Sequence, residues 1–229
     1  MTLHIDWCKR DAAAYACKNW HYSKTVPVSR SVYLGVWEQK TFIGVVIFSW
    51  GANHRIGLPF GLTQTEVCEL VRVALRKHTA PVSRIVALAL KFLHKQSPKI
   101  FLVVSYADPA EGHIGGIYQA GNWAYLGKTS DSFEYRIGAQ RLHKRTFTGE
   151  NFGGPRKQLP SNAKRVRTEG KHKYVYALDK AWREKLAALA QPYPKRVGSA
   201  DSGTGGDQPS RGGAIPTSTL QITAVAPEV

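Results

Sequence analysis

The side chains with the clearest chemical use lie in short polar segments between apolar runs. His21 belongs to a Trp-His-Tyr-Ser-Lys segment, and an imidazole that titrates near neutrality can transfer protons or bind a metal. Asp108 follows an apolar run directly, where it suits a general base, a metal ligand or the partner of a cation. Tyr118 lies one helical turn before a Gly-Asn pair that tolerates left-handed geometry. Each residue also has a structural interpretation: a packed histidine, a turn that begins at aspartate, and a core aromatic.

A helix that starts after a predicted strand suggests a binding site for an anion. The strand 67–75 leads into the helix 81–96, where free amides and the helix dipole attract negative charge. Arg76 and Arg84 add positive charge there. The Ser83 side chain could hydrogen-bond a phosphate or cap the N-terminus of its own helix. The pyrophosphate of coenzyme A would fit such a site. An ordinary strand-to-helix crossover is the alternative.

Arg72 lies inside the apolar strand run. If its guanidinium points into the core, it needs an acidic partner, because an unpaired buried charge is very costly. Glu69 and Asp108 are the two carboxylates that we consider for that role. The alternative is an arginine that faces solvent at the edge of the sheet.

The charge of the chain favours a polyanionic partner. Lys and Arg number 32 against 16 Asp and Glu, so the formal net charge is +16. Like charges repel in a compact fold, so this excess indicates nucleic acid. The stretch 136–173 concentrates cations and interleaves aromatic side chains, which can stack on bases. The predicted nucleic-acid-binding residues are Arg141, Lys144, Arg145, Arg156, Lys157, Arg165 and Arg167. A solvated basic loop is the alternative.

Composition predicts one domain followed by a tail. Residues 1–191 alternate strand-like and helix-like segments, whereas residues 192–229 are rich in Gly, Ser, Pro and Thr and predict a flexible tail. No apolar run approaches the ~20 residues of a membrane span, and the N-terminus shows no signal peptide. We therefore expect a cytoplasmic protein without a membrane partner. Three cysteines without a CxxC pair argue against a disulfide framework and a zinc cluster.

The elements that must position these side chains follow from the apolar pattern. We expect helices over 11–19 and 81–96, the latter capped by Thr79, and a further helix that starts at 115–120. The expected strands are 32–37, 42–48, 67–75, 100–106, 123–126 and 133–137. Strands come first, then a strand–helix–strand unit, then helix and strand again. This order predicts a single α/β (α+β) domain with a mixed sheet and at least one parallel crossover.

Several of these segments, in this order, resemble the Mom-type DNA modification proteins of Mu-like phages. The resemblance covers roughly residues 10 to 180 and rests on KNWHYSKTVPV, FIGVVIF, TEVCELVRVAL, APVSRIVALALK, SYADP and GGIYQAGNW. It implies a GNAT-like acyltransferase fold, with a central mixed, mostly antiparallel sheet flanked by helices and a V-shaped opening near Asp108. The acetyl-CoA motif Q/R-x-x-G-x-G/A, typical of that fold, is absent between Arg76 and Ser83.

The resemblance also implies an activity, namely conversion of adenine in duplex DNA to its N6-(methylcarbamoyl) form with acetyl-CoA, which protects phage DNA from host restriction. Its implied catalytic residues are His21, Tyr22, Asp108 and Tyr118, and its implied cofactor-binding residues are Arg72 and Ser83. The positive charge at the strand-to-helix crossover adds Arg76 and Arg84 to the predicted cofactor-binding residues. Tyr118 would be the general acid toward the CoA thiolate, and Asp108 or His21 the proton acceptor. The set of His21, Tyr22 and Asp108 has ligand types that suit an iron ion.

Two other functions stay open at the level of sequence. An N-acetyltransferase that acts on protein or small-molecule amines would share fold and cofactor, but it has no need of the +16 charge. A non-catalytic DNA-binding protein explains the charge but not the grouped His, Tyr and Asp residues. The sequence also leaves the oligomeric state open, including a homodimer. For the first function, we expect the target base to be flipped out of the duplex, because its amine lies inside the base stack.

Overall fold

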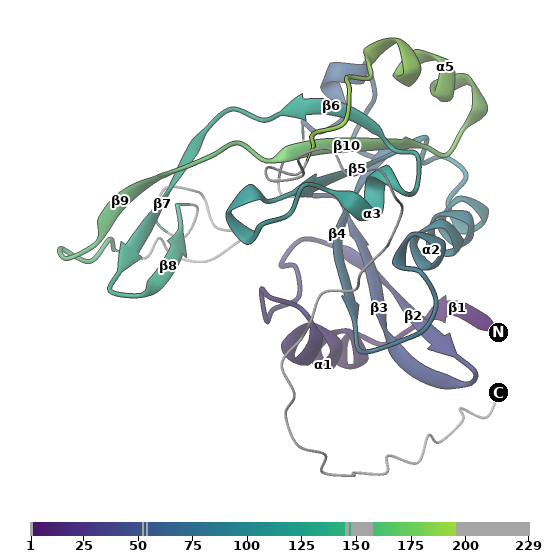
Figure 1. The fold of residues 1–229 in the computed structure, drawn as a ribbon, viewed down its shortest axis with the longest axis horizontal. Helices are drawn as coiled ribbons and strands as arrows, with labels where there is room; N and C mark the ends of the chain where they lie inside the picture. The colour runs from purple at the N-terminus through teal and green to yellow at the C-terminus, as the bar shows by residue number, and fades with distance from the viewer. Residues whose placement is uncertain (1, 52, 54, 145–146, 148–157, 196–229) are drawn as a thin grey trace, which may run out of the picture. The chain divides into compact units, whose positions relative to one another are not determined.

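A seven-stranded sheet in the order β1-β2-β3-β4-β5-β10-β6 forms the centre of the protein (Figure 1). The computed structural model describes residues 2–51, 53, 55–144, 147 and 158–195. The strands in sheet order are β1 (Leu3–Trp7), β2 (Ser31–Glu38), β3 (Thr41–Ser49), β4 (Val67–Leu75), β5 (Leu102–Ala107), β10 (His172–Ala177) and β6 (Ala124–Lys128). Within this sheet β4 and β5 are parallel, and the other neighbours are antiparallel. The predicted α/β fold with a mixed, mostly antiparallel sheet is confirmed.

Helices cover both faces of this sheet. Helix α2 (Val82–Gln96) connects β4 to β5 and buries an apolar stripe that recurs at helical spacing, from Ile85 to Leu93. Helix α1 (Arg10–Trp20) packs on the opposite face, where its small side chains contact Val45 and Ile47 of β3. Strand β3 alternates accordingly, because its neighbouring residues Val46 and Phe48 belong to the core under α2. The remaining helices are α3 (Gly116–Gln119), α5 (Lys180–Leu189), and the 3₁₀ turns η1 (Leu58–Phe60) and η2 (Pro109–Glu111).

The start of α2 differs from the prediction. Pro81 occupies the N-cap position without a side-chain cap, so the expected cap at Thr79 is wrong. The Glu38 carboxylate instead accepts hydrogen bonds from the amides of Thr79 and Ala80, at 3.0 and 2.9 Å. A proline has no N–H to satisfy, and a carboxylate from the neighbouring strand end bonds the amides just before it.

The parallel strands β4 and β5 separate after a short region of pairing. They pair at three positions, which end at Glu69 and Val104. Beyond that point β4 continues beside β3 through an irregularity in register, and β5 continues beside β10. The Leu70 carbonyl accepts a hydrogen bond from the Ser105 hydroxyl at 2.7 Å. The separation leaves one side of β4 without a neighbouring strand, and this is the arrangement that the predicted V-shaped opening requires.

A second, smaller sheet has the order β8-β7-β9. It consists of β7 (Ser132–Ile137), β8 (Gln140–His143) and β9 (Lys164–Thr168), all paired antiparallel. We call it the small sheet. Its strand β9 falls within the basic stretch 136–173, for which the sequence predicted cations but no strand. Strands β1 and β10 and helix α5 were also not predicted. In the part of the chain that the structure describes, no helix has the length and apolar character of a membrane span.

The body of the protein extends to Lys195, past the predicted boundary at residue 191. The Gln191 amide donates to the Tyr125 carbonyl at 2.8 Å, and the Tyr193 hydroxyl donates to the Trp123 carbonyl at 2.8 Å. Residues 192–195 therefore belong to the body. The rest of the predicted tail, residues 196–229, lies outside the described residues.

These contacts predict two different outcomes of truncation. Deletion from Gly198 onward should leave the melting temperature unchanged, because it removes none of the contacts made by Tyr193. Deletion from Pro192 onward removes that hydroxyl and its ring contact with Tyr174, and should cost about 1–2 kcal/mol of the free energy of unfolding. Denaturant titration of both truncated chains measures this difference. Equal stability of the two chains would show that Tyr193 contributes nothing.

Candidate active site

Three segments that lie far apart in the sequence meet where β4 and β5 separate. The segment after α1 contributes His21 and Tyr22, β4 contributes Arg72, and α3 contributes Tyr118. Electrostatic interactions link Arg72 to His21 and Tyr22 to Tyr118, so these side chains lie close together. The Tyr22 ring also lies against two imidazoles, with centroid distances of 4.3 Å to His21 and 5.7 Å to His113. Four of the predicted site residues therefore lie close to one another, namely His21, Tyr22, Arg72 and Tyr118.

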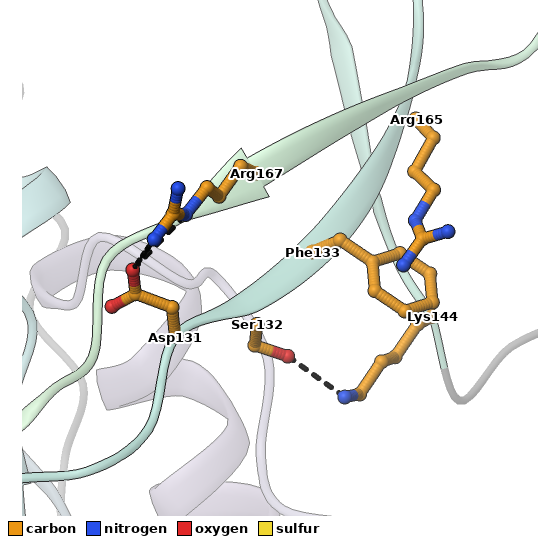
Figure 2. Close-up of a pocket in the computed structure, with 6 residues that line it drawn as sticks. All are labelled: Asp131, Ser132, Phe133, Lys144, Arg165 and Arg167. Atoms are coloured by element: carbon orange, nitrogen blue, oxygen red, sulfur yellow. Dashed lines mark hydrogen bonds and ion pairs between the residues drawn. The ribbon is translucent and has the colours of Figure 1, made fainter.

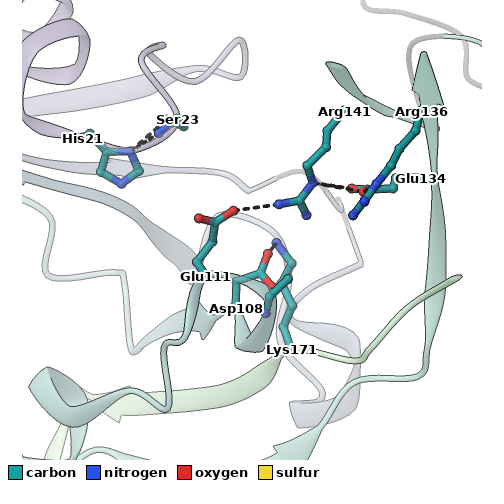
Figure 3. A network of polar contacts seen from close by, with 9 residues as sticks. His21, Ser23, Asp108, Glu111, Glu134, Arg136, Arg141 and Lys171 are labelled. Carbon is teal, nitrogen blue, oxygen red and sulfur yellow. Dashed lines mark hydrogen bonds and ion pairs between the residues drawn. The ribbon is translucent and has the colours of Figure 1, made fainter. Parts of the chain in front are cut away.

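His21 is buried and uncharged at neutral pH. Its Nδ1 accepts a hydrogen bond from the Ser23 amide at 3.1 Å and lies 2.8 Å from the Ser23 hydroxyl oxygen (Figure 3). Burial, and then the interaction with Arg72, lowers the pKa of His21 to about 4. Because Nδ1 accepts, the single proton of the neutral ring is on Nε2. His21 therefore offers a hydrogen-bond donor through Nε2.

Tyr118 is 8% exposed and packs between aromatic rings. Its ring centroid lies 5.0 Å from that of Trp123 and 5.1 Å from that of Tyr174. Burial raises its pKa to about 12, with further contributions from Tyr22 and Glu69, against the lowering effect of Ser105. The Ser105 hydroxyl oxygen lies 2.7 Å from the Tyr118 hydroxyl and from the Leu70 carbonyl. The phenol thus stays protonated at neutral pH.

The helix that carries Tyr118 depends on a glycine at its start. Gly115 has a φ of +84°, and a Cβ atom there would lie 2.3 Å from the Tyr174 ring. Tyr174 fixes the same turn, because its hydroxyl donates to the Ile114 carbonyl at 2.5 Å. Asn122, after the helix, has a φ of 56°, as expected from the Gly-Asn pair. A left-handed residue at each end therefore sets the direction of this short helix.

Asp108 pairs with Lys171 and not with Arg72. Its carboxylate lies 2.9 Å from the Lys171 ammonium and accepts a hydrogen bond from the Ala110 amide at 3.0 Å, which caps η2 (Figure 3). Burial alone would raise the pKa of Asp108, but the bonds from Lys171 and Ala110 outweigh it, and the pKa lies below its usual value. Of the two partners considered for Arg72, Asp108 is therefore excluded by its own contacts. The carboxylate is ionised at neutral pH.

Arg72 has an unused hydrogen-bond donor. Its Nη1 donates to the Val71 carbonyl at 2.7 Å, whereas its buried Nε has no hydrogen-bond partner among the described residues. A buried donor without a partner costs free energy, and an anionic ligand could supply the missing acceptor. The predicted cofactor-binding role of Arg72 is compatible with this geometry.

Of the other predicted cofactor-binding residues, Arg76 directly follows β4, whereas Ser83 and Arg84 lie in the first turn of α2. Arg76 and Arg84 are exposed and make no ion pair within the ranges that the structure describes, and Ser83 is half-buried. The Pro81 carbonyl accepts from the amides of Arg84 and Ile85. Helix geometry leaves the first amides of α2 without an intrahelical acceptor. The binding of an anion by these residues stays a prediction.

The side chains predicted to bind iron do not fit a metal centre. The described residues contain no group of three or more His, Cys, Asp or Glu side chains that could hold a metal. In the predicted set, Nδ1 of His21 already accepts from Ser23, and the carboxylate of Asp108 is bound by Lys171 and Ala110. Both groups would have to give up their partners before they could bind iron. We therefore derive no step through iron.

The predicted nucleic-acid-binding residues divide into three groups. Arg141 donates to Glu134 at 2.9 Å and to Glu111 at 2.9 Å, so two carboxylates already match its charge (Figure 3). We call the ion pairs of Arg141 with Glu134 and Glu111 the Arg141 clasp. The clasp joins the small sheet to η2, and its carboxylates make Arg141 a poor contact for phosphate. Three others line a hollow on the small sheet, namely Lys144, Arg165 and Arg167 (Figure 2). The remaining three lie outside the described residues, namely Arg145, Arg156 and Lys157.

Two residues of the site were not among its predicted members. Glu69, considered only as a partner of Arg72, interacts electrostatically with Tyr118 and Tyr106. His113 lies beside Tyr22 and interacts with His21. Glu69 could have been found from the sequence, because a carboxylate inside a buried strand run needs a reason to be there. His113 lies in a polar loop whose pattern gave no such signal.

Comparison with known proteins agrees with the resemblance seen in the sequence. Residues 2–195 match the Mom protein family. The chain is 29% identical over 185 residues to the methylcarbamoylase mom of Escherichia phage Mu, with 76% of each chain covered. Similar solved structures include spermidine N-acetyltransferase from Vibrio cholerae, at 10% identity, 79% and 98% coverage and a TM-score of 0.45. Another is a probable acetyltransferase from Staphylococcus epidermidis, at 10% identity, 77% and 99% coverage and a TM-score of 0.43.

Proposed function

The chain belongs to the Mom protein family, and from this premise we propose that it modifies adenine in duplex DNA to an N6-(methylcarbamoyl)-type derivative with acetyl-CoA. The phage Mu relative carries the name methylcarbamoylase. Such a modification would shield phage DNA from host restriction enzymes. The observation that carries the proposal is the pair of neutral, buried donors, His21 and Tyr118, where β4 and β5 separate.

Neutral donors in a buried site stabilise negative charge that develops during a reaction. Tyr118 keeps its proton at neutral pH, and His21 presents Nε2–H, so both can donate to an oxyanion or a leaving thiolate. Arg72 adds a positive charge beside His21. In a region of low dielectric, fixed donors act more strongly than they do in water. Tyr118 therefore suits the general-acid role, and Asp108, ionised at neutral pH, is the proposed proton acceptor.

The residues around the start of α2 and the free side of β4 would hold acetyl-CoA. Arg76, Arg84 and the first amides of α2 suit its phosphates, and Ser83 lies in the same helical turn. When bound, this cofactor supplies an acyl group as a thioester. A methylcarbamoyl group contains a nitrogen that an acetyl group lacks, so the reaction also requires a nitrogen donor. The contribution of the protein is to bind and orient the reactants, to donate hydrogen bonds and to transfer protons.

Tyr22 suits the recognition of an extruded base. Its side chain is 53% exposed although it lies beside the buried His21. An exposed aromatic ring at a reaction site offers a surface on which a flipped adenine can stack. We assign Tyr22 this stacking role in place of metal binding.

The role of His21 predicts a larger loss of activity for one amide substitution than for the other. In His21→Asn, the side-chain oxygen can replace Nδ1 as acceptor for Ser23, but the Nε2–H donor is lost, and the rate should fall ~10²-fold. In His21→Gln, the amide reaches toward the position of Nε2 and should keep a larger share of the activity. The measurement is the initial rate of adenine modification at pH 7. If the asparagine variant were the more active, His21 would serve only to hold Ser23.

Nucleoside analysis of DNA from cells that express the chain tests the proposed function. The expected product is an adenine nucleoside heavier by a methylcarbamoyl group. Acetylated protein or polyamine with unmodified DNA would instead identify an N-acetyltransferase of amines. Neither product, together with tight binding to DNA, would identify a non-catalytic DNA-binding protein.

A further inference from the structure

The two faces of the small sheet carry different side chains. Residues directly opposite in antiparallel strands share a face, so Phe133 lies on the same face as Arg167, and Tyr135 on the same face as Arg165. The alternate residue Glu134 points to the other face. We call the first the outer face and the second the inner face.

The inner face is occupied by ion pairs. Glu134 is 8% exposed and accepts hydrogen bonds from Arg136 and Arg141, each at 2.9 Å. Arg141 extends from there to Glu111 of η2. Two carboxylates therefore balance two guanidinium groups. Lys164, opposite Arg136, adds a cation at the end of this face, which is turned toward the segment after β5.

The outer face contains a hollow that is lined by three cationic side chains. Its volume is about 600 Å³, and its lining residues are Asp131, Ser132, Phe133, Lys144, Arg165 and Arg167 (Figure 2). Three of these side chains are cations, and the fourth charged residue is the carboxylate Asp131. Arg167 pairs with the carboxylate of Asp131 at 2.6 Å, yet its side chain is 83% exposed.

An aromatic ring holds two of the cations in position. The guanidinium carbon of Arg165 lies 3.8 Å from the centre of the Phe133 ring, and the ammonium of Lys144 lies 5.1 Å from it. Lys144 also donates a hydrogen bond to the Ser132 hydroxyl at 2.7 Å. A cation–π contact orients a cation without cancelling its charge. The hollow thus presents ordered positive charge to the solvent.

We propose that this hollow binds the phosphate backbone of duplex DNA, as a contact separate from the site that receives the reacting adenine. The proposal rests on the proposed function, which supplies DNA as the substrate. Guanidinium and ammonium groups are the usual protein contacts to phosphate, and such contacts position a protein on DNA without reading its sequence. The hollow opens on the face opposite the Arg141 clasp, so DNA bound there leaves the clasp intact. The +16 charge of the chain favours the same partner.

The double variant Lys144→Gln/Arg165→Gln, made in the full chain, tests this surface. Binding to a fluorescent DNA duplex is measured by anisotropy between about 50 and 200 mM salt, the range over which phosphate contacts show clearly. Each phosphate contact contributes about 0.9 to the slope of log affinity against log salt, so the slope should fall by about two. The affinity at low salt should fall about tenfold or more.

The matched control is Lys91→Gln/Lys95→Gln, which removes the same charge from exposed positions on α2. Its salt slope should equal that of the wild-type chain. A second variant, Arg165→Lys, keeps the charge and should keep the slope, which separates phosphate binding from damage to the sheet. The proposal is wrong if the double variant binds like the wild type or if the α2 control loses as much affinity.

The same proteins separate this proposal from the proposed function. Modified adenine in wild-type cells, together with unchanged DNA affinity of the double variant, would reject the hollow and keep the reaction. A loss of affinity in the double variant, with no modified adenine in wild-type cells, would keep the hollow as a DNA contact and reject the reaction.

Discussion

Tyr118→Phe should lower the rate of adenine modification ~10²- to 10⁴-fold, which is the usual contribution of a general acid. The substitution removes one hydroxyl and keeps the ring, so the contacts with Trp123 and Tyr174 persist. Ser105 still has the Leu70 carbonyl as an acceptor, which limits the cost to the fold. The measurement is the rate of modification by purified or cell-expressed protein, with circular dichroism to confirm folding.

Tyr125→Phe is the matched control for this prediction. Tyr125 is also buried, lies 5.2 Å from Tyr174 in the same group of rings, and has a hydroxyl bonded to His172 at 2.9 Å. Its loss should cost a similar amount of stability but leave the rate near that of the wild type. Equal rates for the Tyr118 variant and the wild type would support the alternative in which Tyr118 is only a core aromatic.

Asp108→Asn should also lower the rate ~10²- to 10⁴-fold, because the variant lacks the ionised carboxylate that accepts a proton. The asparagine oxygen can still accept the Ala110 amide and keep the cap of η2, so the segment should stay folded. DNA affinity should change little. A normal rate in a folded variant would show that Asp108 takes no part in the reaction and serves only as the ion-pair partner of Lys171.

The same variant predicts a dependence of stability on pH. The pKa of Asp108 in the folded chain lies below its ordinary value, so the carboxylate contributes stability above that ordinary value. The wild type should exceed the variant by up to about 1 kcal/mol at pH 7, a small figure because Lys171 is half exposed. This difference should disappear as the pH falls through the folded pKa. Urea titrations at pH 7 and at successively lower pH below 3.8 would measure it, and a difference that does not decline over that acid range would contradict the ion pair.

The sequence predicted the core strands well where apolar runs had clear ends. Strand β4 begins and ends at the predicted residues, and α2 differs by one residue at its start. Strand β10 was missed although Tyr174 and Val175 are fully buried between β5 and β6. Its short run of alternating residues follows a cluster of cations. Because of that charge, the stretch was interpreted as a basic segment that binds nucleic acid and not as a strand. Helix α5 buries few side chains, Leu186 among them, so its apolar periodicity is weak.

The sequence suggested residues for the candidate site but not the partners of those residues. Strand ends and polar loops pointed to His21, Asp108 and Tyr118. The pairing of Asp108 with Lys171 follows from the register of β5 and β10, in which Ala107 faces His172 and the next residues outward are therefore opposite. No local pattern reveals a contact between residues so far apart in the chain. The clasp at Arg141 was hidden for the same reason, since it depends on how the small sheet meets η2.

The most direct test of the central claim is a side-by-side nucleoside analysis of DNA from cells that express the wild-type chain, Tyr118→Phe and Tyr125→Phe. We expect methylcarbamoyl-type adenine with the wild type and Tyr125→Phe, and little or none with Tyr118→Phe. Unmodified adenine with a folded wild-type chain, or equal amounts of product with all three proteins, would contradict a DNA-modifying site built around the buried donors His21 and Tyr118.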